Sequence, residues 1–233
     1  MIAQEKIFRE YDIRGVVDTD FDSGLAEMLG RAYAALVIEA SEGDSFTVAV
    51  GNDCRVTGGK LKAALMRGLC DGGVNVLDCG MGPTPQLYYA VFTQDVHGGI
   101  QVTGSHNPPD QNGFKMMIGK TTLSGEYIQR LKAKIFEVAA NNELQAADNM
   151  CVTEFDARSA YIAELIERSK PHMGSRTIKV IVDAGNGVGG MVAPEVLRQL
   201  GCEVVEMYCD PDGRFPNHHP DPTVLVNIAE LRK

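Results

Sequence analysis

Short apolar segments rich in β-branched residues alternate with helical patterns through the first half of this chain. The segments FTVAV (46–50), VNVLDC (74–79) and GGIQVT (98–103) have the length and composition of buried strands. Between the first two, apolar residues recur at the spacing of one helix face, at Leu61, Ala64, Leu65 and Leu69. This alternation is typical of a parallel α/β sheet with right-handed connections.

The same patterns extend the first domain on both sides. Asp22 is placed to cap a helix that runs to Ala40, and GFKMMI (113–118) is predicted to be an added antiparallel strand. A further helix is predicted from Ser124. The polar stretch 139–149 has no periodicity and is interpreted as a linker, so we predict a domain boundary near residue 150.

Beyond that boundary the sequence predicts a single βαβ unit. It consists of a helix over 156–169, a strand over 177–184, a helix ending at Gly201 and a strand over 202–208. A parallel sheet of only two strands is too small to bury a core of its own, because parallel sheets need cover on both faces. The predicted fold class is therefore α/β, with mixed, mostly parallel sheets sandwiched by helices, one complete domain at 1–150 and an incomplete one at 151–233.

Composition excludes several classes of partner. The 22 Lys and Arg against 31 Asp and Glu give a formal net charge of −9, which is unlike a nucleic-acid binder or a protein of anionic membrane surfaces. Charged residues lie within the first ten positions, unlike the apolar core of a signal peptide. No apolar run approaches the length of a membrane-spanning helix. The six cysteines form no ligand spacing. We expect a reduced, cytoplasmic protein.

The segment VTGSHNPPDQNGFK (102–115) places Ser105 and His106 directly after an apolar strand. Ligands of open α/β sheets bind at the carboxyl ends of the strands. Prolines stiffen the exit of this loop, and Gly and Asn tolerate unusual dihedral angles, so the serine is expected to be rigid and exposed. The same residue types also dominate ordinary turns, and from composition both interpretations stay open.

The neighbours of this serine favour a phosphoryl carrier over a hydrolase. The side chain of a residue at i+1 diverges from its neighbour, so His106 is a poor general base for Ser105, and a G-x-S-x-G elbow is lacking. A phosphate adds about −1.5 to −2 charges and calls for cations nearby. Lys115, His106 and Arg14 are the candidates.

Three motifs carry a family resemblance. FREYDIRG (8–15), the serine segment (102–115) and FPNHHPDP (215–222) resemble the α-D-phosphohexomutases, most closely the bacterial phosphomannomutase/phosphoglucomutase group. The resemblance covers the whole chain, as the first domain and most of the second of a four-domain family. It implies an isomerase, an intramolecular phosphotransferase that interconverts hexose 1-phosphate and hexose 6-phosphate of mannose or glucose through a hexose bisphosphate.

The resemblance also implies roles for individual residues. Ser105 would carry the phosphoryl group, with Lys115 and Arg14 beside its phosphate. His106 would line the same loop. Tyr11 and Arg55 would bind substrate. Arg55 lies in GNDCR (51–55), where the alternative is that Asp53 and Arg55 form only a structural pair.

Magnesium is the cofactor that the resemblance implies. The Ser105 phosphate would be one ligand of the ion, and the family's aspartate-rich loop D-G-D-G-D-R is expected beyond the end of the chain. Because those carboxylates would be missing, the chain alone is expected to be inactive. The alternative is a non-catalytic α/β fragment that binds a phosphosugar or a nucleotide.

Two further motifs have competing interpretations. GNGVGG (185–190) satisfies G-x-G-x-x-G after a strand, and Glu206 lies at a suitable offset for a ribose contact. A dinucleotide fold needs two mononucleotide halves, so close packing of a helix on a strand is the favoured interpretation. His218 and His219 suggest a metal, but adjacent side chains point apart, and a proline-braced surface or interface loop is favoured.

Overall fold

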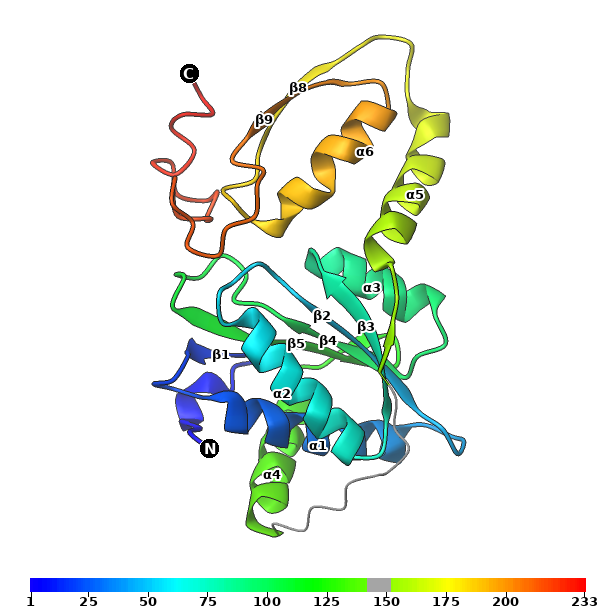
Figure 1. The fold of residues 1–233 in the computed structure, drawn as a ribbon, viewed down its shortest axis with the longest axis vertical. Coiled ribbons are helices and arrows are strands. Elements are labelled where there is room, and N and C mark those ends of the chain that lie inside the picture. The colour runs from blue at the N-terminus through cyan, green and yellow to red at the C-terminus, as the bar shows by residue number, and fades with distance from the viewer. Residues whose placement is uncertain (142–151) are drawn as a thin grey trace.

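The computed structural model describes residues 1–141 and 152–233, which form two α/β domains stacked along the long axis of the molecule (Figure 1). The first domain is built on a seven-stranded sheet with the strand order β1-β5-β4-β2-β3-β7, and β6 pairs with β5. Its strands are β1 (Ile13–Val16), β2 (Thr47–Asn52), β3 (Asn75–Met81), β4 (Gly98–Val102), β5 (Gln111–Ile118), β6 (Thr121–Thr122) and β7 (Val152–Glu154). Its helices are α1 (Ser23–Ala40), α2 (Gly58–Asp71), α3 (Thr84–Thr93) and α4 (Glu126–Asn141).

The directions of the strands confirm the predicted fold class. β2 is parallel to β3 and β4, and β7 is parallel to β3. β5 runs antiparallel to β4, as the sequence predicted for this added strand, and β1 runs antiparallel to β5. The sheet is therefore mixed, with a parallel centre.

Helices cover both faces of this sheet, and the alternation of side chains along β2 shows how. Val48 and Val50 point into a large apolar core with α1, α2 and α4. Ala49 points the other way, into a smaller core with α3 and the start of α5. The cap predicted for α1 is confirmed, because the Asp22 side chain accepts a hydrogen bond from the Leu25 N–H.

Two edge strands were not predicted. β1 is four residues long, includes an arginine and a glycine, and pairs with β5, which lies about a hundred residues further along the chain. Local periodicity cannot reveal such a strand. β7 is also missed, and it places residues 152–154 in the first sheet. The predicted linker lies mostly outside the described residues, and the division into 1–150 and 151–233 stays a prediction.

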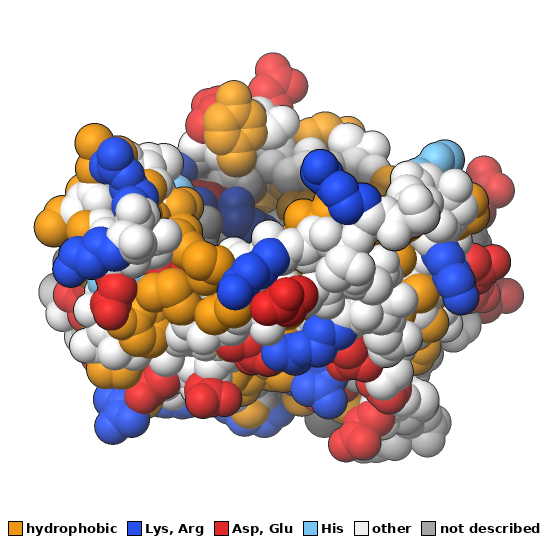
Figure 2. Space-filling model, turned by 90° about the horizontal axis from the view of Figure 1, so that it is seen from above, with side chains coloured by type: hydrophobic (Ala, Val, Ile, Leu, Met, Phe, Trp, Pro, Cys, Tyr) orange, Lys and Arg blue, Asp and Glu red, His pale blue; other side chains and the backbone are white. Residues whose placement is uncertain are grey.

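The second domain contains α5 (Ala157–Ser169), α6 (Ala193–Gln199), β8 (Lys179–Asp183) and β9 (Glu203–Met207). β8 and β9 form a two-stranded parallel sheet, as the sequence predicted. Apolar side chains gather on part of the surface seen from this end of the molecule (Figure 2). The large apolar side chains exposed in this domain are Met173, Ile178, Ile181, Val205, Val224, Leu225 and Val226.

The strand order creates a crevice at one end of the first sheet. After β2 the chain passes through α2 to β3, and it then crosses back through α3 to β4 on the other side of β2. Open α/β sheets bind ligands at such a switch point, outside the carboxyl ends of the strands. Among the described residues, no helix has the length and apolar character needed to cross a membrane.

Candidate active site at the serine loop

Residues 103–110, which we call the serine loop, connect the carboxyl end of β4 to β5. Ser105 is exposed at its tip and has a φ of 57°, in the left-handed region that non-glycine residues rarely adopt. Its N–H donates to Thr103 Oγ1 at 2.9 Å. The prediction that the Ser105 and His106 side chains diverge was wrong: Ser105 Oγ lies 3.4 Å from His106 Nδ1, because the backbone at Ser105 is left-handed and not extended. Because this backbone conformation costs about 1–2 kcal/mol, the surrounding structure has to hold it.

The guanidinium of Arg55 holds the serine loop from beneath. Its side chain is completely buried, and each of its five N–H groups has an acceptor within the protein. Nη2 donates to the carbonyl oxygens of Ser105 (3.0 Å) and Asn107 (2.7 Å). Nη1 donates to the carbonyl oxygens of Pro108 (2.5 Å) and Gln111 (2.8 Å). Four carbonyl oxygens of one loop and its exit therefore converge on one cation.

Asp53 completes this arrangement. Its carboxylate accepts from the Arg55 Nε at 3.2 Å and from the Thr103 hydroxyl at 2.6 Å, and the Arg55 N–H donates to it at 3.0 Å. Burial lowers the pKa of Arg55, and the charge of Asp53 opposes that effect. A guanidinium stays protonated in proteins, so Asp53 and Arg55 form a buried ion pair whose remaining bonds are to the serine loop.

The two cations predicted to lie beside the phosphate share one buried carboxylate. Arg14 on β1 donates to Asp12 Oδ2 through Nε (2.9 Å) and Nη2 (2.5 Å), and Lys115 Nζ on β5 lies 3.4 Å from the same oxygen. Arg14 also donates to the Asn107 Oδ1 of the serine loop at 3.1 Å. The group of Arg14, Lys115 and Asp12 thus keeps a formal charge of +1 next to the loop, which favours an anion there.

The structure places the predicted residues at different distances from the loop. Ser105, His106 and Arg14 are in or bonded to it, and Lys115 joins through Asp12. Tyr11 is exposed beside β1, with 64% of its surface accessible, and its contact with a sugar stays a prediction. Substrate binding by Arg55 also stays a prediction, although its five N–H groups are already used inside the protein.

Sequence reasoning did not identify Asp12 and Thr103 as parts of the site. The sequence could have indicated Asp12, because residues two apart on an extended strand point to the same side. Arg14 follows Asp12 at that spacing, so the two side chains could be expected to meet. Thr103 lies two residues before Ser105, and its hydroxyl oxygen accepts from the Ser105 N–H. Nothing in the sequence pairs Thr103 with Asp53, which lies 50 residues earlier.

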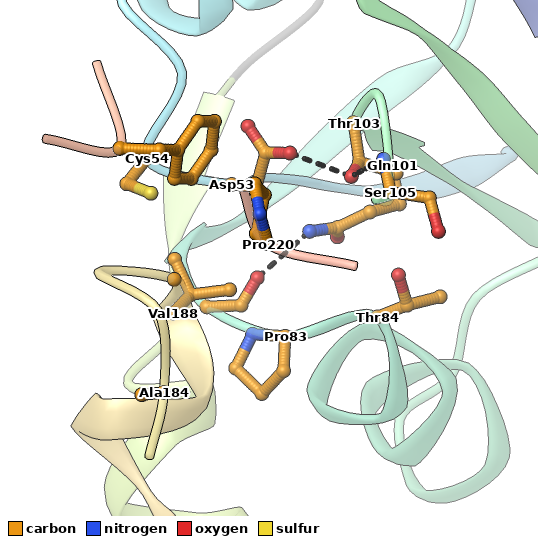
Figure 3. Close-up of a pocket in the computed structure, with 13 residues that line it drawn as sticks. Asp53, Cys54, Pro83, Thr84, Gln101, Thr103, Ser105, Ala184, Val188 and Pro220 are labelled. Atoms are coloured by element: carbon orange, nitrogen blue, oxygen red, sulfur yellow. Dashed lines mark hydrogen bonds between the residues drawn. The ribbon is translucent and has the colours of Figure 1, made fainter. Parts of the chain in front are cut away.

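A pocket of about 220 Å³ lies between the two domains, next to the serine loop (Figure 3). Residues that follow β2, β3 and β4 form one side of it, and Ala184, Gly187 and Val188 of the second domain form another. This is the crevice expected from the strand order. The Cys54 thiol also lines it, but burial and the charge of Asp53 raise the pKa of Cys54 to about 11, so it stays protonated at neutral pH.

The described residues contain no group of three or more His, Cys, Asp or Glu arranged to hold a metal ion. Two buried carboxylates beside the serine loop, those of Asp12 and Asp53, are both bonded to arginine. Magnesium prefers an octahedral set of oxygen ligands, which these residues do not offer. These residues do not by themselves fit the predicted Mg²⁺.

The glycine loop of the second domain, residues 185–190, serves close packing. A Cβ added to Gly190 would lie 2.1 Å from the Cys209 carbonyl oxygen, which a side chain cannot do. Glu206, the candidate ribose ligand, instead pairs with Arg198 at 2.5 Å. The arrangement agrees with the structural interpretation of this motif and gives no support to a dinucleotide site.

His218 is paired with a carboxylate. Its Nε2 lies 3.0 Å from Asp183 Oδ1, at the end of β8, and its Nδ1 lies 2.9 Å from the His219 carbonyl oxygen. Burial alone would lower the pKa of His218, but the His219 carbonyl and Asp183 outweigh burial and raise it. The pair fixes the FPNHHPDP segment to the sheet of the second domain.

We expect this pair to make the stability of the second domain depend on pH. A raised folded pKa means that the stabilisation is fully present below the unfolded value of about 6.5 and is lost as pH rises through the folded value. Thermal melts should therefore show a melting temperature that falls as pH rises above about 6.5. His218→Gln should remove that dependence, whereas exposed His172→Gln should keep it. An unchanged pH profile in His218→Gln would contradict the assignment.

Comparison with known proteins identifies relatives of both domains. The model of the phosphoglucomutase/phosphomannomutase alpha/beta/alpha domain I matches residues 5–142, and that of domain II matches residues 159–233. A phosphoglucomutase of Neisseria gonorrhoeae is 44% identical over 226 residues, which are 97% of this chain and 47% of that protein. A phosphomannomutase/phosphoglucomutase of Pseudomonas aeruginosa is 42% identical, over 97% of this chain and 46% of that protein.

Solved structures agree with the sequence relatives. The crystal structure of a phosphoglucomutase/phosphomannomutase family protein from Burkholderia thailandensis has a TM-score of 0.88 and 39% identity, and it covers 99% of this chain and 49% of that one. The chain spans about half the length of the curated relatives it matches.

Proposed function

Because the chain belongs to the phosphoglucomutase/phosphomannomutase family, we propose that it contributes the phosphoryl-carrying half of a hexose phosphate mutase, with Ser105 as the carrier. The proposed substrates are mannose or glucose phosphates, on which a phosphoglucomutase and a phosphomannomutase/phosphoglucomutase among its relatives are named to act. The reaction interconverts the 1-phosphate and the 6-phosphate through a hexose bisphosphate.

The proposed chemistry consists of two phosphoryl transfers. In the first, the bond between phosphorus and Ser105 Oγ breaks while a bond forms to the free hydroxyl of the hexose phosphate, and the proton of that hydroxyl passes to Oγ. In the second, the other phosphoryl group of the bisphosphate moves to Oγ, and the serine proton returns to the sugar oxygen. The exposed position of Ser105 leaves Oγ open to a substrate from solvent.

Charge stabilisation is the task proposed for Arg14 and Lys115. Phosphoryl transfer spreads negative charge over the equatorial oxygens, so catalysis depends on positioned cations rather than on covalent help from the protein. Asp12 fixes both cations, and Asn107 ties Arg14 to the loop that carries the phosphate. His106, at 3.4 Å from Oγ, is proposed to assist the proton movement. Tyr11 is proposed to contact the sugar.

Magnesium is retained as the cofactor that family membership implies, with the Ser105 phosphate as one ligand. The described residues supply no carboxylate cage, so the roles proposed for them are binding, orientation and charge stabilisation alone. Arg55 is proposed to shape the site from beneath the loop.

One observation carries this proposal: a serine held in a left-handed conformation at the carboxyl end of a strand, with two cations joined to the same loop. The test is to map phosphate on the protein. Incubation with glucose 1,6-bisphosphate should add one phosphoryl group to the intact mass, and fragmentation should place it in residues 102–115. Phosphate on another residue, or consistent absence of the group from active enzyme, would refute the proposal.

A further inference from the structure

An aromatic ring of the second domain contacts Arg55, the residue that holds the serine loop. Phe215 lies over the guanidinium of Arg55, with 5.2 Å between Arg55 Cζ and the ring centroid. Arg55 belongs to the first domain and Phe215 to the FPNHHPDP segment of the second, so this contact crosses the domain boundary. An aromatic face attracts a cation, more strongly where water is excluded. The completely buried Arg55 side chain meets that condition.

The segment that carries Phe215 is seated closely on the turn that carries Arg55. A Cβ added to Gly213 would lie 2.3 Å from the Cys54 carbonyl oxygen and 2.6 Å from Arg55 Cα, so only glycine allows this approach. The Cys54 thiol donates to the Asn186 carbonyl at 3.4 Å, and the Asp212 N–H donates to the same carbonyl at 2.9 Å. Backbone from the second domain is thus fitted to backbone of the first.

The conformation of Phe215 itself has to be held. Its φ is 49°, in the left-handed region, where a bulky residue is strained. The Phe215 N–H donates to the Asp212 carbonyl at 2.9 Å, and Arg214 forms a fork with the Asp212 carboxylate at 2.6 and 2.8 Å. The local structure therefore aims the ring toward Arg55 at an energetic cost, and such strain points to a functional role.

The hydrogen bonds of the Arg55 guanidinium leave it little freedom to move. Every N–H group is bonded, to Asp53 and to four carbonyl oxygens of the loop and its exit, including that of Ser105. A displacement of this guanidinium has to move several of those carbonyls with it. We infer that Phe215 is a positioning residue for Ser105, acting through Arg55, so that the serine loop reaches its working conformation when the second domain is seated.

The catalytic part of this inference rests on the proposed function, whereas the coupling itself does not. The first experiment therefore measures the loop directly, by amide hydrogen exchange in the whole chain. Two N–H groups report on it: that of Ser105, bonded to Thr103 Oγ1, and that of Asn107, bonded to the Gly104 carbonyl. Phe215→Leu removes the aromatic face and keeps an apolar side chain. Phe215→Tyr keeps the face.

A second aromatic contact between the domains provides the matched control. Tyr161 on α5 packs against Tyr89 on α3, with ring centroids 5.7 Å apart, away from the serine loop. Phe215→Leu should lower protection of the two loop amides by about fivefold to thirtyfold. Phe215→Tyr should restore it, and Tyr161→Leu should leave it unchanged. Equal protection in Phe215→Leu and wild type would overturn the inference, as would equal losses in Phe215→Leu and Tyr161→Leu.

A kinetic readout separates positioning from general stability. In the catalytically active protein, Phe215→Leu should lower kcat by about fivefold to thirtyfold. Phe215 lines the same pocket as Ser105, so KM is measured in parallel, and we expect the larger change in kcat because the ring acts on the serine loop through Arg55. A raised KM with unchanged kcat would overturn the positioning role. If wild type takes no phosphate on Ser105 while the exchange results hold, the proposed function fails and the coupling stands.

Discussion

Replacing Ser105 by alanine should abolish steady-state turnover and leave the fold intact. Phosphoryl shuttling needs an oxygen nucleophile at this position, and alanine offers none. The Ser105 side chain is exposed, and the bonds that hold the loop use its backbone N–H and carbonyl oxygen, which alanine retains. The expected change in the free energy of unfolding is within about 0.5 kcal/mol.

This prediction is checked by assaying glucose 1-phosphate conversion in the active protein, together with intact mass and thermal melts of the variant. Ser175→Ala is the matched control, because Ser175 is an exposed loop serine of the second domain. It should keep full turnover and the phosphoryl increment. Substantial turnover in Ser105→Ala would remove Ser105 from the mechanism, and loss of turnover in Ser175→Ala would show that the assay reports general damage.

The parallel core of the fold was predictable because its signals are local. β2, β3 and β4 are short segments that each contain buried apolar residues between turn signals, and α2 shows its buried face at helical spacing. β1 was not predictable in the same way. Its residues pair with a strand about a hundred positions away, and the sequence there reads as a motif rather than as a strand.

The residues of the candidate site also fall into those that the sequence could predict and those that it could not. Ser105, Arg14 and Lys115 were named because family motifs include them, and the structure places Arg14 and Lys115 on one carboxylate next to the serine loop. Around Arg55, the pair with Asp53 was an alternative that the sequence left open, but the bonds to the serine loop could not be predicted. This arrangement joins residues 50 to 56 positions apart and is covered by Phe215 from another domain, and only tertiary structure brings these groups together.

Lys115 offers the sharpest test of charge stabilisation. Lys115→Met should lower kcat by about a hundredfold to a thousandfold, the loss typical when one preorganised charge is removed from a transition state. Its cost in stability should be small. Asp12 keeps its two hydrogen bonds from Arg14, so the buried carboxylate is not left unpaired, and the Lys115 side chain is partly exposed.

Lys62 is the matched control for this experiment, because it is also a lysine paired with an aspartate. Its ammonium bonds to Asp78, on β3 and away from the serine loop, and both side chains are largely buried. Lys62→Met leaves Asp78 without that partner, so it should lower the melting temperature and leave kcat unchanged. The two variants should thus show opposite patterns of rate and stability. Equal turnover in Lys115→Met and wild type would show that the charge of Lys115 does not stabilise the transferring group, and Arg14 alone would then have to supply that charge from the serine loop's edge.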